Sequence, residues 1–574
     1  MKSYRSRLAS VSSTLVLGGT VLLTACAPQP GAQVGSLADA GSPERCASLA
    51  SSLAGSAPVS DLVVTAAQWQ AAEALPAHCL VEGYYGAHEG RVGGEYRTGF
   101  RMRLPDDWNG RFFFQGGGGS NGVVGDATGP NGAGNPAALI RGYAVIAQDS
   151  GHDNTRNTVP DHQGELVFGF DPQARRDYGH ASLIRTYDLG HAMLQAFYDR
   201  SAETNIFWGC SKGGQEGMAF AQRYPEAFDG IVAMAPGMSL PRAAIAEAWD
   251  VQAFAGIFES RGEPVSAFNF ASLISQEELG LVGREVLAEC DGDDGLEDGL
   301  IGAVGACTTA RIEPRLRALT CEADATGPCL ETAQIDALVS VIDGARNGAG
   351  EPLYAPFAWD SGLASPGWSV WKIGLEPAPP SLNILLGGAS LAAVFTTPPT
   401  ALPGNPQALL EWQMGFDFDV DAQRIYAVEP PFQTSAWQDV GMRSTDLSAF
   451  ADQGGRLIVP HGVSDPVFSV LDTIDWWNGV NETAGGDAAE FARVFAVPGM
   501  NHCAGGPGPD RFDSLTALEA WVLEGDAPDR ISASAAPDGP LAGLSVPLCP
   551  YPQIAVGNRQ DGQTRYQCRL PEQD

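Results

Sequence analysis

A serine in the pattern Gly-x-Ser-x-Gly occurs twice in this sequence, and this pattern can hold a nucleophile on a tight turn between a strand and a helix. The two matches centre on Ser120 and Ser211. Glycine accounts for 70 of the 574 residues, so the pattern alone is a weak signal. Residues 205–208 predict a short strand and residues 213–224 predict a helix. These elements flank Ser211, which we therefore interpret as the nucleophile.

The segment around Ser120 predicts a different role. It follows a predicted strand at residues 112–114 and a run of four glycines at 116–119, and no helical pattern follows it. Glycines let backbone N–H groups approach a developing oxyanion at hydrogen-bond distance. We expect this segment to form part of an oxyanion hole, and the alternative is a flexible loop.

An acid and a base follow Ser211 in the order that a hydrolase of this type requires, which is nucleophile, acid, base. Two histidines, His461 and His502, lie after Ser211. Asp465 lies just past the predicted strand that contains His461, where the acid of such a triad belongs. With Asp465 as the acid, His502 is the remaining downstream histidine. The order predicts a triad of Ser211, Asp465 and His502.

The cysteine content predicts disulfides. There are 11 cysteines, and ten remain when Cys26 is set aside. An even number of this kind is typical of a disulfide framework in an oxidising compartment. Cys210 precedes the candidate nucleophile and Cys503 follows the candidate base, so contact between Ser211 and His502 would bring both cysteines close together. A disulfide there would join the two loops, and the alternative is two unrelated thiols.

The composition favours a large folded protein that could position these groups. Hydrophobic residues make up 44% of the chain, which is enough for an apolar core and excludes wholesale disorder. Acidic residues outnumber basic ones by 68 to 34, for a net charge of −34. Such a surface repels phosphate backbones, so we expect no nucleic-acid partner. The length fits one enlarged domain or a domain with a large insertion.

The first residues predict export. Basic residues precede a mostly apolar stretch that ends at residue 25, the pattern of a secretory signal peptide. Leu-Thr-Ala directly before Cys26 resembles the bacterial lipoprotein box, in which the cysteine is acylated; the alternative is an ordinary signal peptide. We expect a signal peptide at 1–25 and a tether at 26–45. The protein would lie in the periplasm or at the outer membrane, with membrane contact only through a lipid anchor at Cys26, or outside the cell.

Several motifs together resemble the tannase and feruloyl esterase family over essentially the whole mature chain. They are Gly209-Cys210-Ser211-x-Gly213-Gly214, Asn501-His502-Cys503, Trp108-Asn109-Gly110-Arg111-Phe112, Gly151-His152-Asp153 and Leu548-Cys549-Pro550-Tyr551-Pro552. The resemblance implies an α/β fold, an α/β-hydrolase core with a large lid domain inserted between nucleophile and triad acid. We expect the core at 46–240 and 445–574, the latter with a disulfide-closed C-terminus, and the lid at 241–444.

The resemblance also implies specific pairings and contacts. The disulfides would be Cys46–Cys79, Cys210–Cys503, Cys290–Cys307, Cys321–Cys329 and Cys549–Cys568. Phe468 matches a substrate-facing aromatic residue of the family. For Trp368 and Trp371 the resemblance leaves two alternatives, contact with substrate or a place in the core of the lid.

An acidic, glycine-rich segment predicts a calcium site. Five acidic residues lie within the eight positions 291–298, where they would repel one another if nothing neutralised them. Ca²⁺ prefers six to eight hard oxygen ligands on such loops, although the spacing is not that of an EF-hand. By resemblance the ligands would be Asp291, Asp294 and Asp298, with the backbone carbonyls of Leu296 and Leu300. The ion would be structural, and the alternative is a solvated acidic turn.

The expected reaction is ester hydrolysis through an acyl-enzyme. His502 would take the proton of Ser211 as it attacks the ester, with Asp465 orienting the histidine. The backbone N–H groups of Lys212 and Gly117 would hold the oxyanion. Besides the structural Ca²⁺ we expect no cofactor.

The identity of the substrate depends on the lid. The expected substrates are esters of small aromatic acids of feruloyl, galloyl or benzoate type. The alternative is mono(2-hydroxyethyl) terephthalate, which a bacterial member of the family hydrolyses with a lid arginine that holds the free carboxylate. No Lys or Arg lies between Lys372 and Arg424 here, which favours an uncharged acyl group. Other classes left open are a peptidase, a lipase and a non-catalytic binding lipoprotein.

Overall fold

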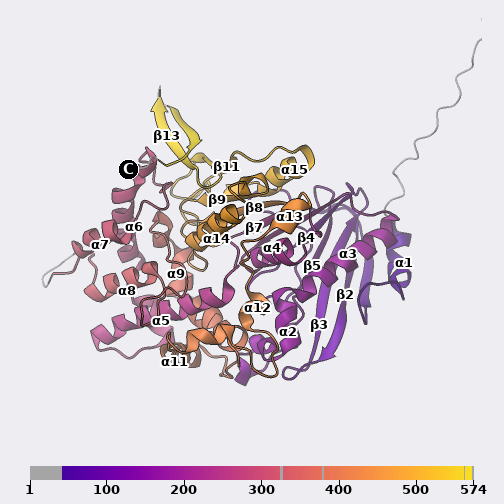
Figure 1. The fold of residues 1–574 in the computed structure, drawn as a ribbon, viewed down its shortest axis with the longest axis horizontal. Coiled ribbons are helices and arrows are strands. Elements are labelled where there is room, and N and C mark those ends of the chain that lie inside the picture. The colour runs from indigo at the N-terminus through magenta and orange to yellow at the C-terminus, as the bar shows by residue number, and fades with distance from the viewer. Residues whose placement is uncertain (1–41, 323–326, 376, 378–379, 561–562, 572–574) are drawn as a thin grey trace, which may run out of the picture. The chain divides into compact units, whose positions relative to one another are not determined.

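The computed structural model describes residues 42–571 except 323–326, 376, 378–379 and 561–562 (Figure 1). The expected signal peptide, Cys26 and most of the expected tether lie outside these residues. Within the described ranges, no helix has both the length and the apolar character needed to cross a membrane.

A nine-stranded sheet forms the centre of the fold, in the spatial order β1-β2-β3-β5-β4-β6-β7-β8-β9. Its strands are β1 Val63–Gln70, β2 His78–Glu89, β3 Glu95–Pro105, β4 Arg111–Gln115, β5 Ala144–Gln148, β6 Thr204–Cys210, β7 Gly230–Met234, β8 Arg456–Gly462 and β9 Ala492–Val497. The first three strands pair antiparallel, and β3 pairs antiparallel with β5. From β5 to β9 all pairs are parallel.

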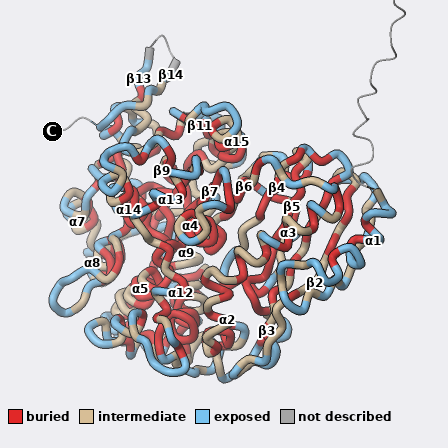
Figure 2. Tube along the Cα trace, turned by 45° about the vertical axis from the view of Figure 1, so that its right-hand side comes forward, coloured by how far each residue is buried: buried red, intermediate tan, exposed pale blue. Residues whose placement is uncertain are grey.

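The apolar runs in the sequence explain the parallel half of this sheet. Every residue of β5 and of β7 is buried, as expected for strands covered on both faces. In β4, Phe112 and Phe114 pack into one apolar cluster with α3 (Ser182–Tyr198) and α4 (Lys212–Arg223). Phe113, pointing the other way, packs into a second cluster with α15 (Ser514–Glu524). Figure 2 shows buried residues along these inner strands and also through the helical segment around α5 and α9.

The segment between β7 and β8 is helical and carries its own apolar core. Its helices are α5 Leu240–Arg261, α6 Gln276–Cys290, α7 Thr309–Arg317, α8 Thr332–Asp343, α9 Pro366–Lys372, α10 Gly388–Ser390, α11 Pro406–Met414, α12 Ala436–Val440 and α13 Ser448–Asp452. Local signals set several ends: Ser275 and Glu278 form a capping box on α6, and Gly262 ends α5 at φ +68°. We refer to this segment as the lid; its expected bounds, 241–444, stay a prediction.

The remaining helices and strands lie at both ends of the described chain and between strands of the central sheet. They are α1 Pro43–Leu53, α2 Pro172–Arg176, α14 Val470–Thr483, β10 Arg511–Phe512, β11 Ile531–Ser534, β12 Ser545–Leu548, β13 Ile554–Gln560 and β14 Gln563–Arg569. Strands β10 to β12 form a small sheet, and β13 and β14 form a hairpin. Cys568 in β14 is bonded to Cys549, which closes the C-terminal part as expected.

All five expected disulfides are present in the structure. They are Cys46–Cys79, Cys210–Cys503, Cys290–Cys307, Cys321–Cys329 and Cys549–Cys568. Four close short loops of 33 residues or fewer, and Cys210–Cys503 joins positions that are 293 apart in the sequence. The long-range disulfide therefore ties the two halves of the core together.

Candidate active site

Ser211 lies on the sharp turn between β6 and α4, as the sequence predicts. Its backbone has φ +65° and ψ −122°, a conformation that costs on the order of 1–3 kcal/mol for a residue with a side chain. The turn needs glycine at its neighbours, because a Cβ atom at Gly209 would lie 2.6 Å from the backbone of Gly213. The strand, the strained turn and the helix together form a nucleophile elbow.

His502 and Asp465 are in contact. His502 Nδ1 lies 2.8 Å from Asp465 Oδ2, and since the carboxylate can only accept, this nitrogen carries the proton. The other carboxylate oxygen accepts from the backbone N–H groups of Val467 and Phe468, at 2.8 and 3.0 Å. Burial alone would raise the pKa of Asp465, but the charge of His502 and hydrogen bonds from His461 and His502 outweigh it and hold this pKa below its ordinary value. Asp465 is therefore a permanent anion that orients His502.

His502 Nε2 is the nitrogen left for proton transfer. It is buried and has no hydrogen-bond partner among the described residues. The Cys210–Cys503 disulfide, with its Cα atoms 6.0 Å apart, joins the residue before Ser211 to the residue after His502. Ser211 and His502 line the same cavity. The structure thus brings the three predicted triad residues together in one site.

His461 supports the acid instead of competing with His502. It is fully buried, with Nδ1 2.8 Å from Thr473 Oγ1 and Nε2 2.9 Å from the carbonyl oxygen of Phe468. Because both ring nitrogens have partners, this histidine is not available as a base. Its position 3.4 Å from Asp465 Oδ2 places it beneath the acid loop.

The prediction that the backbone N–H of Gly117 holds the oxyanion is wrong. Its N–H donates to Glu216 Oε2 at 2.9 Å, so it does not point to the nucleophile. Gly119 is the glycine of this run that lines the cavity. The backbone N–H of Lys212, at the first position of α4, donates to none of the described residues and keeps its expected role available.

Glu216 is a buried acid that sequence reasoning missed. Besides Gly117 it accepts from Asn121 Nδ2 at 2.8 Å, from Ser150 Oγ at 3.2 Å and from Lys212 Nζ at 3.0 Å. Both members of the Lys212–Glu216 pair are at most 1% exposed. This acid therefore fixes the glycine-rich segment to the helix that carries the nucleophile. The sequence indicates this ion pair only through the four-residue spacing of Lys212 and Glu216, which places them on the same face of a helix.

The cavity at the nucleophile has a volume of about 260 Å³. Its apolar walls come mostly from the lid, with Leu240, Ala243, Ala244, Trp371, Leu382, Leu386 and Phe395, and from the acid loop, with Val467 and Phe468. Trp371 and Phe468 also pack edge-on against the ring of His502, with centroids 5.6 and 5.3 Å away. Both expected aromatic contacts are thus at the site. Trp368 does not line the cavity but packs against Phe254, so of its two alternatives the structure shows the place in the core of the lid and not the contact with substrate.

Lid residues also hold the two triad loops. Asp360 Oδ2 accepts from Ser464 Oγ at 2.6 Å and from the N–H of Gly499 at 2.7 Å. Asn501 Nδ2 donates to the carbonyl oxygens of Gly362 and Ser464, both at 3.1 Å. These contacts lie next to Asp465 and His502 in the sequence, so the lid helps to set the geometry of the triad.

A larger cavity, of about 420 Å³, lies between the acidic loop, α14 and the C-terminal strands. It is lined by residues such as Asp294, Leu471, Pro547 and Tyr566 and by none of the triad residues. The chemistry therefore belongs to the smaller cavity.

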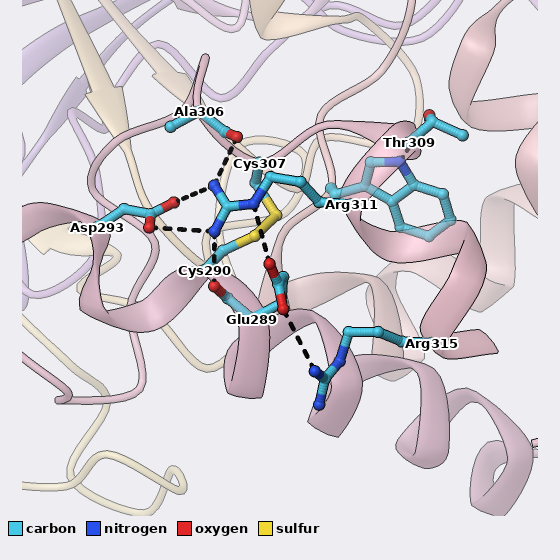
Figure 3. Close-up of a disulfide and its surroundings, with 9 residues drawn as sticks. Glu289, Cys290, Asp293, Ala306, Cys307, Thr309, Arg311 and Arg315 are labelled. Atoms are coloured by element: carbon cyan, nitrogen blue, oxygen red, sulfur yellow. Dashed lines mark hydrogen bonds and ion pairs between the residues drawn. A yellow bond between two sulfur atoms is a disulfide. The ribbon is translucent and has the colours of Figure 1, made fainter. Parts of the chain in front are cut away.

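The expected calcium loop lies beside the Cys290–Cys307 disulfide. Arg311 pairs with Asp293 and Glu289, and Arg315 with Glu289 (Figure 3). The carboxylates of Asp291, Asp294 and Asp298 instead accept backbone N–H groups of the same loop, at 2.9 to 3.2 Å. Asp293 thus differs from Asp291, Asp294 and Asp298, because an arginine neutralises it.

The donor set of this loop fits a hard cation. Burial, together with the charges of Asp298 and Asp291, raises the pKa of Asp294 to about 7. The carbonyl oxygens of Leu296 and Leu300 accept no hydrogen bond from the described residues. In the described ranges no three His, Cys, Asp or Glu side chains alone form a metal site, so these two carbonyl oxygens would be needed as ligands.

Comparison with known proteins identifies relatives over nearly the whole described chain. The family model "Tannase and feruloyl esterase" matches residues 90–567. A mono(2-hydroxyethyl) terephthalate hydrolase of Piscinibacter sakaiensis is 42% identical over 522 residues, which cover 86% of this chain and 85% of that protein.

Two solved structures share the fold. Feruloyl esterase B from Aspergillus oryzae superposes with a TM-score of 0.71 at 21% identity, covering 92% of this chain and all of that one. The tannin acyl hydrolase from Aspergillus niger gives 0.63 at 18% identity, covering 92% and 96%. The expected fold class, an α/β-hydrolase core with a large insertion, is confirmed.

Proposed function

The chain belongs to the tannase and feruloyl esterase family and is a carboxylic ester hydrolase, and from this premise we propose that Ser211, Asp465 and His502 hydrolyse esters of small aromatic acids. One observation carries the proposal. The cavity that holds Ser211 and the protonatable face of His502 has aromatic and aliphatic walls from the lid. Such walls suit a flat apolar acyl group next to the nucleophile.

The proposed reaction has two stages. His502 Nε2 accepts the proton of Ser211 while the serine oxygen attacks the ester carbonyl carbon, and Asp465 stabilises the resulting imidazolium. The backbone N–H of Lys212 and a cavity-facing N–H of the glycine run, for which Gly119 replaces Gly117, stabilise the oxyanion. The protonated His502 then gives its proton to the leaving alcohol. Water, deprotonated by the same histidine, cleaves the acyl-enzyme.

The charges around the cavity support an uncharged acyl group. The nearest lysines are already paired: Lys372 Nζ lies 2.5 Å from Asp250 Oδ2, and Lys212 Nζ lies 3.0 Å from Glu216 Oε1. A substrate carboxylate buried in the cavity would cost several kcal/mol unless a cation or strong hydrogen-bond donors met it. We therefore propose esters of feruloyl, galloyl or benzoate type as substrates.

Mono(2-hydroxyethyl) terephthalate is the second candidate, because a relative that bears this name is 42% identical. The deciding experiment compares kcat/KM for methyl ferulate, methyl gallate, methyl benzoate and mono(2-hydroxyethyl) terephthalate at matched ionic strength. A preference for the first three supports the proposal. A clear preference for the terephthalate monoester would show that a donor near the cavity holds its carboxylate.

We also propose one structural Ca²⁺ on the acidic loop. Asp291, Asp294 and Asp298 would hold it with the carbonyls of Leu296 and Leu300, and the ion would neutralise carboxylates that no lysine or arginine of the described chain pairs. Because the triad cavity has none of these residues in its lining, the proposed ion would be structural and would take no part in the reaction.

The proposed location is outside the cytoplasm, in the periplasm, at the outer membrane or beyond. Five disulfides support it, because such bonds persist in oxidising compartments. A lipid anchor at Cys26 is part of the same proposal. Mass spectrometry of the N-terminal peptide from the native host tests it, and an unmodified N-terminus other than Cys26 would contradict the anchor.

A further inference from the structure

A buried acid of the lid faces the acyl cavity without a partner. Glu247, on α5, lines the cavity and is 6% exposed. No hydrogen bond joins either of its carboxyl oxygens to another of the described residues, and only burial and the charges of its neighbours shift its pKa. The carboxyl group lies directly over Gly387, where a Cβ atom would be 1.9 Å from Glu247 Oε2. The absence of a side chain at Gly387 therefore makes room for this acid beside the cavity.

The charged groups around Glu247 make no hydrogen bond to its carboxyl group. Lys372, Asp250 and Asp465 act on it from α9, α5 and the acid loop. Lys372 Nζ is bonded to Asp250 Oδ2, which also accepts from Asn383 Nδ2 at 3.1 Å. Burial, opposed by Lys372 and reinforced by Asp250 and Asp465, raises the pKa of Glu247 to about 8.

An unpartnered acid among the mostly apolar lid residues of the cavity wall points to a ligand group that completes its hydrogen bonding. A buried acid left without a hydrogen bond is costly, and binding sites use such groups to fix a substrate and to reject analogues that lack the matching group. The hydroxyl of Ser390 lines the same cavity and also makes no hydrogen bond to the described chain. Two polar side chains of the lid, Glu247 and Ser390, thus line the cavity.

We propose that Glu247 binds a hydroxyl group on the aromatic ring of the acyl moiety and so selects phenolic acid esters. This inference rests on the proposed function. A phenolic hydroxyl can donate to the carboxyl oxygen of Glu247 whether that acid is protonated or ionised. A substrate carboxylate would be repelled by the ionised acid, and a plain benzoyl ring would leave the acid unpaired. The hydroxyl is therefore the group that suits this position in both states.

The experiment measures kcat/KM for matched ring-substituted esters. The panel is methyl 3-hydroxybenzoate and methyl 4-hydroxybenzoate, each with its methoxy analogue, and methyl benzoate. We expect the wild type to prefer a hydroxylated ester over its methoxy and unsubstituted analogues by about tenfold or more. Glu247→Leu should bring the ratio to within about threefold of unity while methyl benzoate is still hydrolysed, and Glu247→Gln, whose amide oxygen still accepts, should keep much of the preference.

Glu259→Leu is the matched control, because Glu259 lies on the same helix and is exposed. It should keep the wild-type ratio. A wild type without a hydroxyl preference, or a Glu247→Leu variant with the wild-type ratio, overturns the inference. If Glu247→Leu does not fold, the wild-type series and the Gln variant still decide it. Absence of hydrolysis of every aryl ester by the wild type would instead contradict the proposed function.

Discussion

Replacing Glu216 by glutamine tests whether this buried acid sets the position of the glycine-rich segment. Oε1 of Glu216 accepts from Asn121, Ser150 and Lys212, and Oε2 accepts from the N–H of Gly117. An amide has one oxygen for these four donors. The least costly orientation keeps that oxygen toward the three donors, which turns the NH₂ group against the N–H of Gly117. The segment should therefore move away from the nucleophile.

Two magnitudes follow for Glu216→Gln. The Lys212–Glu216 pair is at most 1% exposed, and breaking such a pair by removing one charge costs about 3–5 kcal/mol of stability. A displaced oxyanion donor near Ser211 costs about 10²-fold in rate. The loss should fall on kcat, with KM little changed, because the oxyanion forms only in the transition state.

The assay measures kcat and KM on an aromatic methyl ester, and Tm by circular dichroism. Glu226→Gln is the control, since Glu226 is exposed just beyond the same helix. In Lys212→Met with Glu216→Leu, an apolar pair replaces the ion pair, which should restore much of the stability but leave kcat low. A Glu216→Gln enzyme with lowered Tm and wild-type kcat would refute the positioning role. Unchanged Tm and kcat would refute the whole argument.

Three further outcomes are expected. Removing the Cys210–Cys503 disulfide with alanine at both positions should cost about 2–5 kcal/mol of stability and reduce kcat/KM. The same change at Cys321 and Cys329, in the lid, should leave kcat/KM near wild type. Equal losses of kcat/KM would contradict a role for the first disulfide in holding the triad. Calcium added to a sample stripped of metal with a chelator should raise Tm, because a hundredfold excess over Kd stabilises the folded state by about 2.7 kcal/mol. Asp294→Ala should abolish this effect. A wild type insensitive to calcium would exclude the site. The pKa of Glu247 is raised to about 8, so between its ordinary pKa and about pH 8 the folded state holds a proton that the unfolded state has lost. Stability should therefore fall as the pH rises through this window, and Glu247→Gln should remove part of the fall in Tm between about pH 6 and 9. Identical slopes for variant and wild type would speak against a buried, unpaired acid.

The triad could be predicted because its signals are local. A strand, a glycine-flanked serine and a helix at 204–223 specify the elbow, and Asp465 and His502 each follow a buried strand of the same parallel sheet. Parallel strands place the residues after their carboxyl ends at one edge, so the order along the chain was enough to bring these groups together. The flanking cysteines added an independent constraint.

The residues that could not be predicted are those whose roles depend on contacts between distant segments. Glu216 binds the N–H of Gly117, 99 residues earlier, and nothing local distinguishes that glycine from Gly119. Trp368 and Trp371 are three positions apart on one short helix, so only the packing of the lid decides which one reaches the cavity. Glu247 looks in sequence like a surface acid of α5, and its burial becomes visible only with Gly387 packed against it.

The most direct test of the central claim is the site of covalent labelling by a fluorophosphonate, which reacts with an activated serine. Peptide mapping by mass spectrometry should find the label on Ser211, with loss of activity in proportion to labelling, and Ser120→Ala should be labelled like the wild type. Ser211→Ala should remain unlabelled and lose on the order of a million-fold in kcat. Labelling at Ser120, or near-normal turnover by Ser211→Ala, would contradict the assignment of Ser211, Asp465 and His502 as the catalytic triad.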